Sequence, residues 1–143
     1  KGLANGVPAG AILGRSQLGS AFSYGSHGST FGGNKLAMAA ASASLTLLKA
    51  DGFLEEVQEK SQLLLEELKE ALADNESVQD IRGLGYMIGI ETTGDLPDLV
   101  ARARAKGLIV LTAGTNVIRL LPPLTITREH IQQAVDILKD TFD

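Results

Sequence analysis

The sequence predicts an α/β protein, and three observations lead to this fold class. Patterns typical of helices and of strands alternate along most of the 143 residues. Hydrophobic residues make up 44% of the chain and charged residues only 21%, which is enough to bury a core. The opening stretch, residues 1–22, is rich in glycine and shows no such pattern over most of its length, and the first fifty residues do not clearly belong to the domain that follows. We therefore predict two regions, residues 1–50 and residues 51–143.

Residues 1–50 begin with a long stretch in which loop residues predominate. Within it, "AGAILG" at 9–14 is the one segment compatible with a short buried strand. The stretch "KLAMAAASASLTLLKA" at 35–50 predicts a helix, because alanine favours helix and small side chains permit a close neighbour. Gly33 and Asn34 mark its expected N-terminus. Polar residues are scarce along this helix, so we expect it to be buried on most of its faces.

Residues 51–143 open with a second predicted helix. Asp51 is a suitable N-cap, and the acidic Glu55 and Glu56 suit the positive end of the helix dipole. Glu56 and Lys60 are spaced to form an ion pair four residues apart. Apolar positions repeat at helical spacing and comprise Val57, Leu64, Leu65, Leu68 and Leu72.

Alternating apolar residues predict strands after this helix. The stretch "VQDIRGLGYMIGIE" at 78–91 is typical of one strand, or of two strands joined at Arg82–Gly83. Its glycines imply close packing above the sheet. Residues 108–111 and 117–123 predict two short strands around a turn at 112–116, and a pair of prolines ends the second strand.

Two further helices complete this region. One covers 95–107, with Pro97 in its first turn and Gly107 past its end. Thr127 is the expected N-cap of the last helix, whose apolar face comprises Ile131, Ala134, Val135, Leu138 and Phe142. Together these elements predict helices packed on a short sheet.

Composition excludes several classes of function. A formal net charge of −4 gives no basic patch for nucleic acid, and no apolar run reaches the ~18 residues of a membrane helix. Cysteine is absent, and the two histidines, His27 and His130, lie far apart in the sequence. We therefore expect neither a disulfide framework nor a metal site. No signal peptide is visible, so we expect a soluble, cytoplasmic protein.

The stretch "HGSTFGGNK" at 27–35 has the composition of a loop that binds an anion. Gly28 and Gly33 have the separation of a P-loop, but Asn34 stands where the lysine is needed and no hydroxyl follows Lys35. We therefore exclude a nucleotide loop of this type. A simpler phosphate site is an open alternative, with hydroxyl groups and backbone N–H groups at the helix start as donors. Composition alone favours a plain glycine turn that caps the helix.

Arg119 is the most unusual charged residue, because it lies inside an otherwise apolar strand. Its charge must be paired or must face a binding site. The sequence leaves a structural salt bridge and a site equally open. Arg82 is expected to form a surface or interdomain pair, and His27 to be a loop residue. Lys1 would attract no attention from its position alone.

Five stretches give the chain its resemblance to a known family. They are "KGLANGVPAGAILG", "HGSTFGGNKLAMAAA", "IRGLGYMIGIE", "GLIVLTAG" and "VIRLLPPLTIT". In this order and spacing they resemble the C-terminal part of the class III pyridoxal-phosphate aminotransferases, over essentially the whole chain. The last strand and its flanks are most similar to the acetylornithine branch of that family. Lys35 departs from the pattern, since the family usually has proline at this position.

The resemblance implies a fold and a catalytic residue. Lys1 matches the lysine that forms the Schiff base with pyridoxal 5'-phosphate, so the chain resembles a fragment cut at this residue. Residues 1–50 would be a remnant of the large cofactor-binding domain of a fold-type I transferase, comprising a loop, a strand and an interdomain helix. Residues 51–143 would be the small C-terminal α/β domain. The aspartate that pairs with the pyridine nitrogen would lie outside the chain.

The resemblance also implies site residues, substrates and a partner. Thr30 matches a threonine that reaches across a homodimer interface to the cofactor phosphate of the other subunit. Ser29 is associated with substrate in the acetylornithine branch, and Arg119 matches an arginine near the substrate pocket. The implied reaction moves the terminal amino group of N-acetylornithine, or of a related ω-amino donor, to 2-oxoglutarate in arginine biosynthesis.

Two alternatives to this enzyme stay open. The 143 residues alone could be a non-catalytic folding or dimerisation module, because the implied cofactor-gripping half is missing. They could instead be a stand-alone α/β domain that binds a small molecule, with Ser29 and Thr30 at an anion site. We expect the isolated chain to be inactive, and its first fifty residues to self-associate or to lack order.

Overall fold

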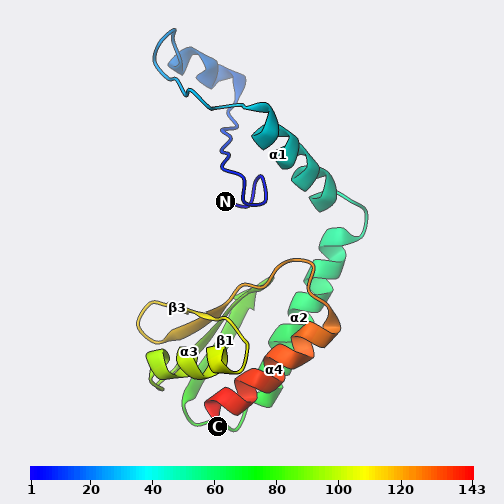
Figure 1. Cartoon of the computed structure of the whole chain (residues 1–143), viewed down its shortest axis with the longest axis vertical. Coiled ribbons are helices and arrows are strands. Elements are labelled where there is room, and N and C mark those ends of the chain that lie inside the picture. Colours follow the sequence, from blue (N-terminus) through cyan, green and yellow to red (C-terminus); the bar gives the residue numbers. More distant parts are fainter. The chain divides into compact units, whose positions relative to one another are not determined.

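The chain forms two compact units, Lys1–Leu54 and Glu55–Asp143, in a computed structural model that describes residues 1–143 (Figure 1). The division lies close to the boundary predicted after residue 50. The assignment of these units to the large and small domains of a longer enzyme stays a prediction. None of the helices combines the length and the apolar character needed to cross a membrane.

The first unit contains a short 3₁₀ helix, η1 (Ser16–Ala21), and one α-helix, α1 (Lys35–Leu48). Asn34 is the N-cap of α1, and its side-chain oxygen accepts a hydrogen bond from the Ala37 N–H at 2.9 Å. Its amide nitrogen donates to the Phe31 carbonyl at 3.0 Å, which closes the turn before the helix. Gly33 has φ +69°, a conformation that favours glycine. The predicted start of this helix is therefore confirmed.

Two predictions for the first unit are wrong. Residues 9–14 form no strand, and Ile12 and Leu13 are 83% and 99% exposed. A strand needs a neighbour to complete its hydrogen-bond ladder, and no strand is present in this unit. Helix α1 buries only Ala37 and Ala41, while Leu36 is 73% exposed. An alanine-rich helix shows a tendency to be buried, but the surface that would bury it is not part of this unit.

The second unit contains a four-stranded antiparallel sheet in the order β1-β2-β4-β3. The strands are β1 (Val78–Leu84), β2 (Met87–Thr92), β3 (Leu111–Ala113) and β4 (Val117–Leu120). Residues 108–110, which were expected to start the third strand, lie outside it. Pro122 and Pro123 follow the end of β4, as predicted.

Of the two alternatives left open for residues 78–91, the structure has two strands, but their junction is not at Arg82–Gly83. The turn lies at Gly85 and Tyr86, because Gly85 adopts φ +55° and reverses the chain there. Gly83 is instead a ladder residue that pairs with Ile88. A Cβ atom at Gly83 would lie 2.8 Å from the Ile88 side chain, so close packing explains this glycine.

Three helices complete this part of the chain: α2 (Phe53–Ala71), α3 (Leu96–Ala105) and α4 (Arg128–Phe142) (Figure 1). Alternate strand residues are buried and face a common apolar core, to which all three helices contribute. The sheet residues of this core are Ile81, Ile88, Ile90, Ile118 and Leu120. The strand residues between them point to the opposite face, where Leu84 and Met87 are exposed.

The helices of the second unit follow the predicted patterns with one exception. Leu64, Leu68 and Leu72 are buried, and Val57 and Leu65 are partly buried against the same core. Helix α3 has Pro97 in its first turn, and Gly107 with φ +91° follows its end. The exception is Asp51, which is not adjacent to α2, because the helix begins at Phe53 after Gly52 turns the chain at φ +79°.

Thr127 caps helix α4, as predicted. Its hydroxyl accepts a hydrogen bond from the His130 N–H at 3.3 Å, and the His130 Nδ1 atom accepts one from the Thr127 N–H at 3.2 Å. Helix α2 is held to this region by Lys60, which pairs with Glu56 at 2.6 Å, as expected, and donates to the Ile126 carbonyl at 3.0 Å. These contacts fix the loop that joins β4 to α4.

Candidate functional site

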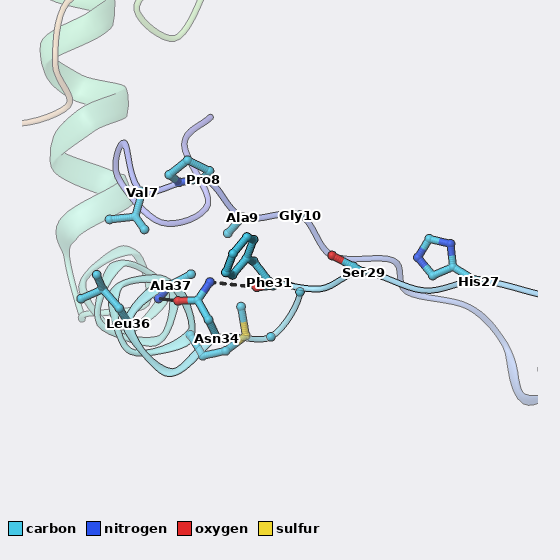
Figure 2. A pocket seen from close by; sticks show the side chains of 13 residues that line it. Val7, Pro8, Ala9, Gly10, His27, Ser29, Phe31, Asn34, Leu36 and Ala37 are labelled. Atoms are coloured by element: carbon cyan, nitrogen blue, oxygen red, sulfur yellow. Dashed lines mark hydrogen bonds between the residues drawn. The ribbon is translucent and has the colours of Figure 1, made fainter. Parts of the chain in front are cut away.

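The loop that precedes α1 borders a hollow of about 820 Å³ in the first unit. Figure 2 shows Phe31 close to the backbone of residues 7–10, and Ser29 and His27 farther along the loop from the helix. The lining residues come from two stretches that are separate in sequence, 7–10 and 27–38. The stretch "HGSTFGGNK" is therefore more than a cap, because it forms one wall of a concave surface.

Ser29 and Thr30 present hydroxyl groups that are exposed and form no hydrogen bond within the chain. Ser29 packs against the turn at Gly32, where a Cβ atom would lie 2.8 Å from the Ser29 Oγ atom. Glycine at this position thus lets the serine side chain approach the backbone. The two hydroxyls are free to donate hydrogen bonds to an anion.

The structure brings only one of the three predicted residues of this unit to the hollow. Ser29 lines it, whereas Thr30 and Lys1 do not. Lys1 is exposed, and its carbonyl accepts a hydrogen bond from the Gly6 N–H at 3.4 Å. Its side chain forms no ion pair. The amine of Lys1 is therefore not engaged elsewhere in its own unit.

Arg119 lies in the second unit on β4, between Gly89 of β2 and Leu111 of β3 in the register of the sheet. The residue is half-buried, it forms no ion pair, and its Nε atom is buried without a hydrogen-bond partner. The structural salt bridge that the sequence left open is therefore absent. An arginine nitrogen buried in this way is costly unless a further group binds it.

Arg82 was expected to form a surface or interdomain pair, and in this structure it forms a surface pair. Its guanidinium bonds to Asp80 at 2.8 Å and to Glu91 at 2.6 Å, and these two carboxylates raise the pKa of Arg82. The second oxygen of Glu91 accepts a hydrogen bond from the Asn116 side chain at 3.0 Å. The bonds from Arg82 and Asn116 lower the pKa of the Glu91 carboxyl. Both oxygens of Glu91 are thus occupied.

Two features of the chain were not expected from the sequence. His27 is a loop residue, as predicted, but it also lines the hollow. Its ring packs edge-to-face with the Phe22 ring, and the two ring centroids are 6.4 Å apart. Tyr86 is only 3% exposed, and its hydroxyl is buried without a partner. Burial raises the pKa of Tyr86, and nearby Lys60 lowers it by a smaller amount. The alternation of apolar residues places Tyr86 inside, but it cannot show that the hydroxyl lacks a partner.

The first unit has groups that suit the aldehyde and the phosphate of pyridoxal phosphate, but none that suits its pyridine nitrogen. The amine of Lys1 suits the aldehyde and the hydroxyl of Thr30 suits a phosphate, but neither residue lines the hollow. The unit has a single acidic residue, Asp51, which follows α1 and lies far along the chain from these groups. The unit therefore offers no carboxylate among these groups for the pyridine nitrogen.

Comparison with known proteins gives a consistent family. The family described as aminotransferase class-III matches residues 1–142. An acetylornithine aminotransferase from Streptococcus mutans is 62% identical over 143 residues, covering all of this chain and 38% of that protein. The enzyme of that name from Bacillus subtilis is 52% identical over 142 residues, covering 99% of this chain and 37% of that protein. The chain thus spans little more than a third of the length of these relatives.

Solved structures show the same relationship and confirm the α/β fold class. Ornithine aminotransferase from Plasmodium yoelii matches with a TM-score of 0.84 and 32% identity, covering 92% of this chain and 36% of that one. Acetylornithine aminotransferase from Elizabethkingia anophelis matches with a TM-score of 0.81 and 31% identity, covering 91% of this chain and 35% of that one. On the evidence of sequence and structure together, the chain belongs to the class III aminotransferase family.

Proposed function

We propose that the chain is part of a pyridoxal-phosphate-dependent aminotransferase that moves the terminal amino group of N-acetylornithine to 2-oxoglutarate. The observation that supports this most strongly is the 62% identity to an acetylornithine aminotransferase along the whole chain. The reaction would belong to arginine biosynthesis in the cytoplasm. Ornithine, succinylornithine and 4-aminobutyrate are the rival amino donors within the same proposal.

Lys1 is the proposed catalytic residue, and its task requires a neutral amine. It would attach the cofactor through its side chain and would then move a proton between two carbon atoms as a general base. When bound, the cofactor supplies an electron sink for this proton transfer. Desolvation favours the neutral form of a lysine, and Lys1 is exposed here. The surface that would cover it is therefore expected from the rest of the enzyme.

Thr30 and Ser29 are proposed to act on the same side of the active site. Thr30 would donate its hydroxyl to the cofactor phosphate held by a second subunit, which makes the enzyme a homodimer with shared active sites. Its exposure and its absence from the hollow of its own unit support an outward role. Ser29, which does line the hollow, would contact the substrate.

Arg119 is proposed to bind a carboxylate of the substrate. An arginine can hold a carboxylate through two parallel hydrogen bonds, and these charge-assisted bonds are stronger than neutral ones. The nearest acids in the register of the sheet are taken by Arg82 and Asn116, so the guanidinium of Arg119 is not neutralised within the chain. This supports a binding role over a structural one.

The experiment uses the full-length protein that contains this chain. Amine transfer to 2-oxoglutarate is measured with N-acetylornithine, ornithine, succinylornithine and 4-aminobutyrate as donors. We expect turnover with all or some of these donors and the highest kcat/KM with N-acetylornithine. No turnover with any donor would reject an aminotransferase, and a preference for another donor would reject the acetylornithine assignment alone.

A second function applies to the 143 residues by themselves. The first unit exposes apolar side chains, and it offers no carboxylate near Lys1 for the pyridine nitrogen of the cofactor. Both features favour a non-catalytic folding or dimerisation module. We expect the isolated chain to show no amine transfer and no saturable binding of pyridoxal phosphate that depends on Lys1. Saturable binding that disappears in a Lys1→Ala variant of the isolated chain would contradict this.

A further inference from the structure

One row of residues crosses all four strands of the sheet. The register places Arg82 of β1 beside Gly89 of β2, Gly89 beside Arg119 of β4, and Arg119 beside Leu111 of β3. Paired residues of neighbouring strands point to the same face. This face is opposite to the buried one, on which the neighbours Ile88 and Ile90 are fully buried. The row thus contains two arginines with a glycine between them.

Neither the backbone nor the core requires glycine at position 89. Its φ lies outside the left-handed region, so other residues can adopt the same conformation. A Cβ atom there would meet only Val117, at 3.0 Å from its Cγ1 atom, and no other atom within 4 Å. Gly83 differs, since a Cβ atom there would clash at 2.8 Å with both the Ile88 side chain and the Met87 carbonyl. A side chain at position 89 would therefore crowd the partly buried Val117 on the exposed face, which would have to shift, but it would meet no core residue.

The two arginines beside Gly89 are in different states. Arg82 is bonded to Asp80 and Glu91, and Asn116 takes the remaining oxygen of Glu91. Arg119 has no acidic partner, and its Nε atom is buried without a hydrogen bond. A carboxylate that reaches this face therefore finds an unneutralised guanidinium next to the one position in the row without a side chain.

We propose that Gly89 is a specificity-determining residue, which keeps the surface beside Arg119 open so that a substrate carboxylate can reach the guanidinium. This inference rests on the proposed function, because it assigns the carboxylate to an amino or oxo acid. Cross-strand neighbours have Cβ atoms about 4.5–5.5 Å apart, so a long side chain at 89 would lie over Arg119. Such a side chain would obstruct binding of the carboxylate without removing the arginine.

The test compares Gly89→Leu with Gly89→Val in the full-length protein. We expect the KM for 2-oxoglutarate to rise about tenfold or more for leucine and less for valine, with kcat changed by less than about threefold. Ala113→Leu is the matched control, because it adds the same bulk to the same face one row away, beside Val117. The control is expected to keep the KM of the parent protein. Equal KM values in all four proteins would overturn the proposal.

A double-mutant cycle separates obstruction from a structural effect. If leucine at position 89 acts through Arg119, the double variant Gly89→Leu/Arg119→Gln has the same KM as Arg119→Gln alone. If the two substitutions act independently, the KM of the double variant rises by the product of the two single-variant increases. Multiplication would overturn the proposal. Where Gly89→Leu fails to fold, the valine variant completes the same cycle.

Failure of the proposed role of Gly89 can be told apart from failure of the proposed aminotransferase function. If the parent protein transfers no amine, the proposed function fails, and calorimetric titration with glutarate still decides the role of Gly89. Binding of glutarate that requires Arg119 and is lost in Gly89→Leu supports it. Binding that survives in Gly89→Leu, or the absence of any binding to the parent protein, overturns it.

Discussion

At the scale of single residues, Arg119 shows what a sequence can and cannot reveal. A charged residue inside an apolar strand is a visible signal, because such a charge needs a partner or a ligand. To choose between an ion-pair partner and a ligand, one must know whether a nearby acid such as Glu91 is free, and the sequence does not show this. Only the side-chain bonds in the structure show that Arg82 and Asn116 take the two oxygens of Glu91. The binding role of Arg119 stays a proposal, now supported by the absence of an ion pair.

Replacing Arg119 is predicted to weaken carboxylate binding. In the full-length protein, Arg119→Gln should raise the KM for 2-oxoglutarate about tenfold or more, since hydrogen bonds to charged groups contribute about 1.5–3 kcal/mol. Steady-state kinetics gives the value. Arg128→Gln is the control, because Arg128 only pairs with Glu59 at an exposed position. An equal effect of both variants would show that general charge, rather than Arg119, governs binding.

The Glu91 carboxyl is predicted to make stability depend on pH in acid. Its bonds to Arg82 and Asn116 hold its pKa below the ordinary value of 4.5. The carboxylate therefore stabilises the fold above pH 4.5, and this contribution is lost as the pH falls through the lowered pKa. Glu91→Gln should flatten the decline in stability below pH 4.5, as measured by urea unfolding from pH 3 to pH 7. Glu70→Gln, at an exposed site without an ion pair, should keep the slope of the parent chain.

At the scale of elements, most helices and strands were predictable because local rules and tertiary packing agree. Thr127 was identified as a cap from its position before an apolar helical stripe, and the structure confirms it. The junction between β1 and β2 was misplaced because Gly83 and Gly85 look alike in the sequence. Gly85 reverses the chain, whereas Gly83 makes room for Ile88. Those two roles differ only in three dimensions.

The capping box of α4 is predicted to be a measurable part of the stability of the second unit. Thr127→Ala should lower the free energy of unfolding of the chain by about 1 kcal/mol, as for other N-caps. His130→Ala removes the reciprocal bond and should not add fully to Thr127→Ala, since each variant breaks the same motif. Urea unfolding measures both. Thr125→Ala is the control, as Thr125 is exposed and forms no side-chain hydrogen bond; an equal loss there would contradict the role of the cap.

At the scale of the whole molecule, the two units differ in how much they bury. The second unit has a continuous core from three helices and from strands β1, β2 and β4, whereas the first unit buries only Ala4, Ala37 and Ala41. The sequence predicted a division after residue 50, and it also predicted a buried α1 and a buried strand at 9–14. Both errors have one physical cause, since apolar composition indicates a tendency to be buried and cannot supply the covering surface. The same limit applies to Lys1, which is exposed in this chain.

Because the two units bury apolar surface to different extents, their backbone amides are predicted to be protected from hydrogen exchange to different extents. Amides of residues 9–34 should exchange with deuterium at least about a hundredfold faster than those of β2, because local opening needs little free energy where few apolar contacts exist. Hydrogen exchange of the isolated chain, followed by mass spectrometry, measures this. Comparable protection of both segments at low concentration would contradict the account. Protection that appears only as concentration rises would reveal self-association through the exposed apolar side chains.

The most direct test of the central claim is the site of cofactor attachment in the full-length protein. The protein is incubated with pyridoxal phosphate, reduced with borohydride and digested, and the modified lysine is identified by mass spectrometry. We predict a single modified lysine at Lys1, and loss of both the adduct and amine transfer in a Lys1→Ala variant that still folds. Modification confined to another lysine, or amine transfer that survives in Lys1→Ala, would contradict the claim.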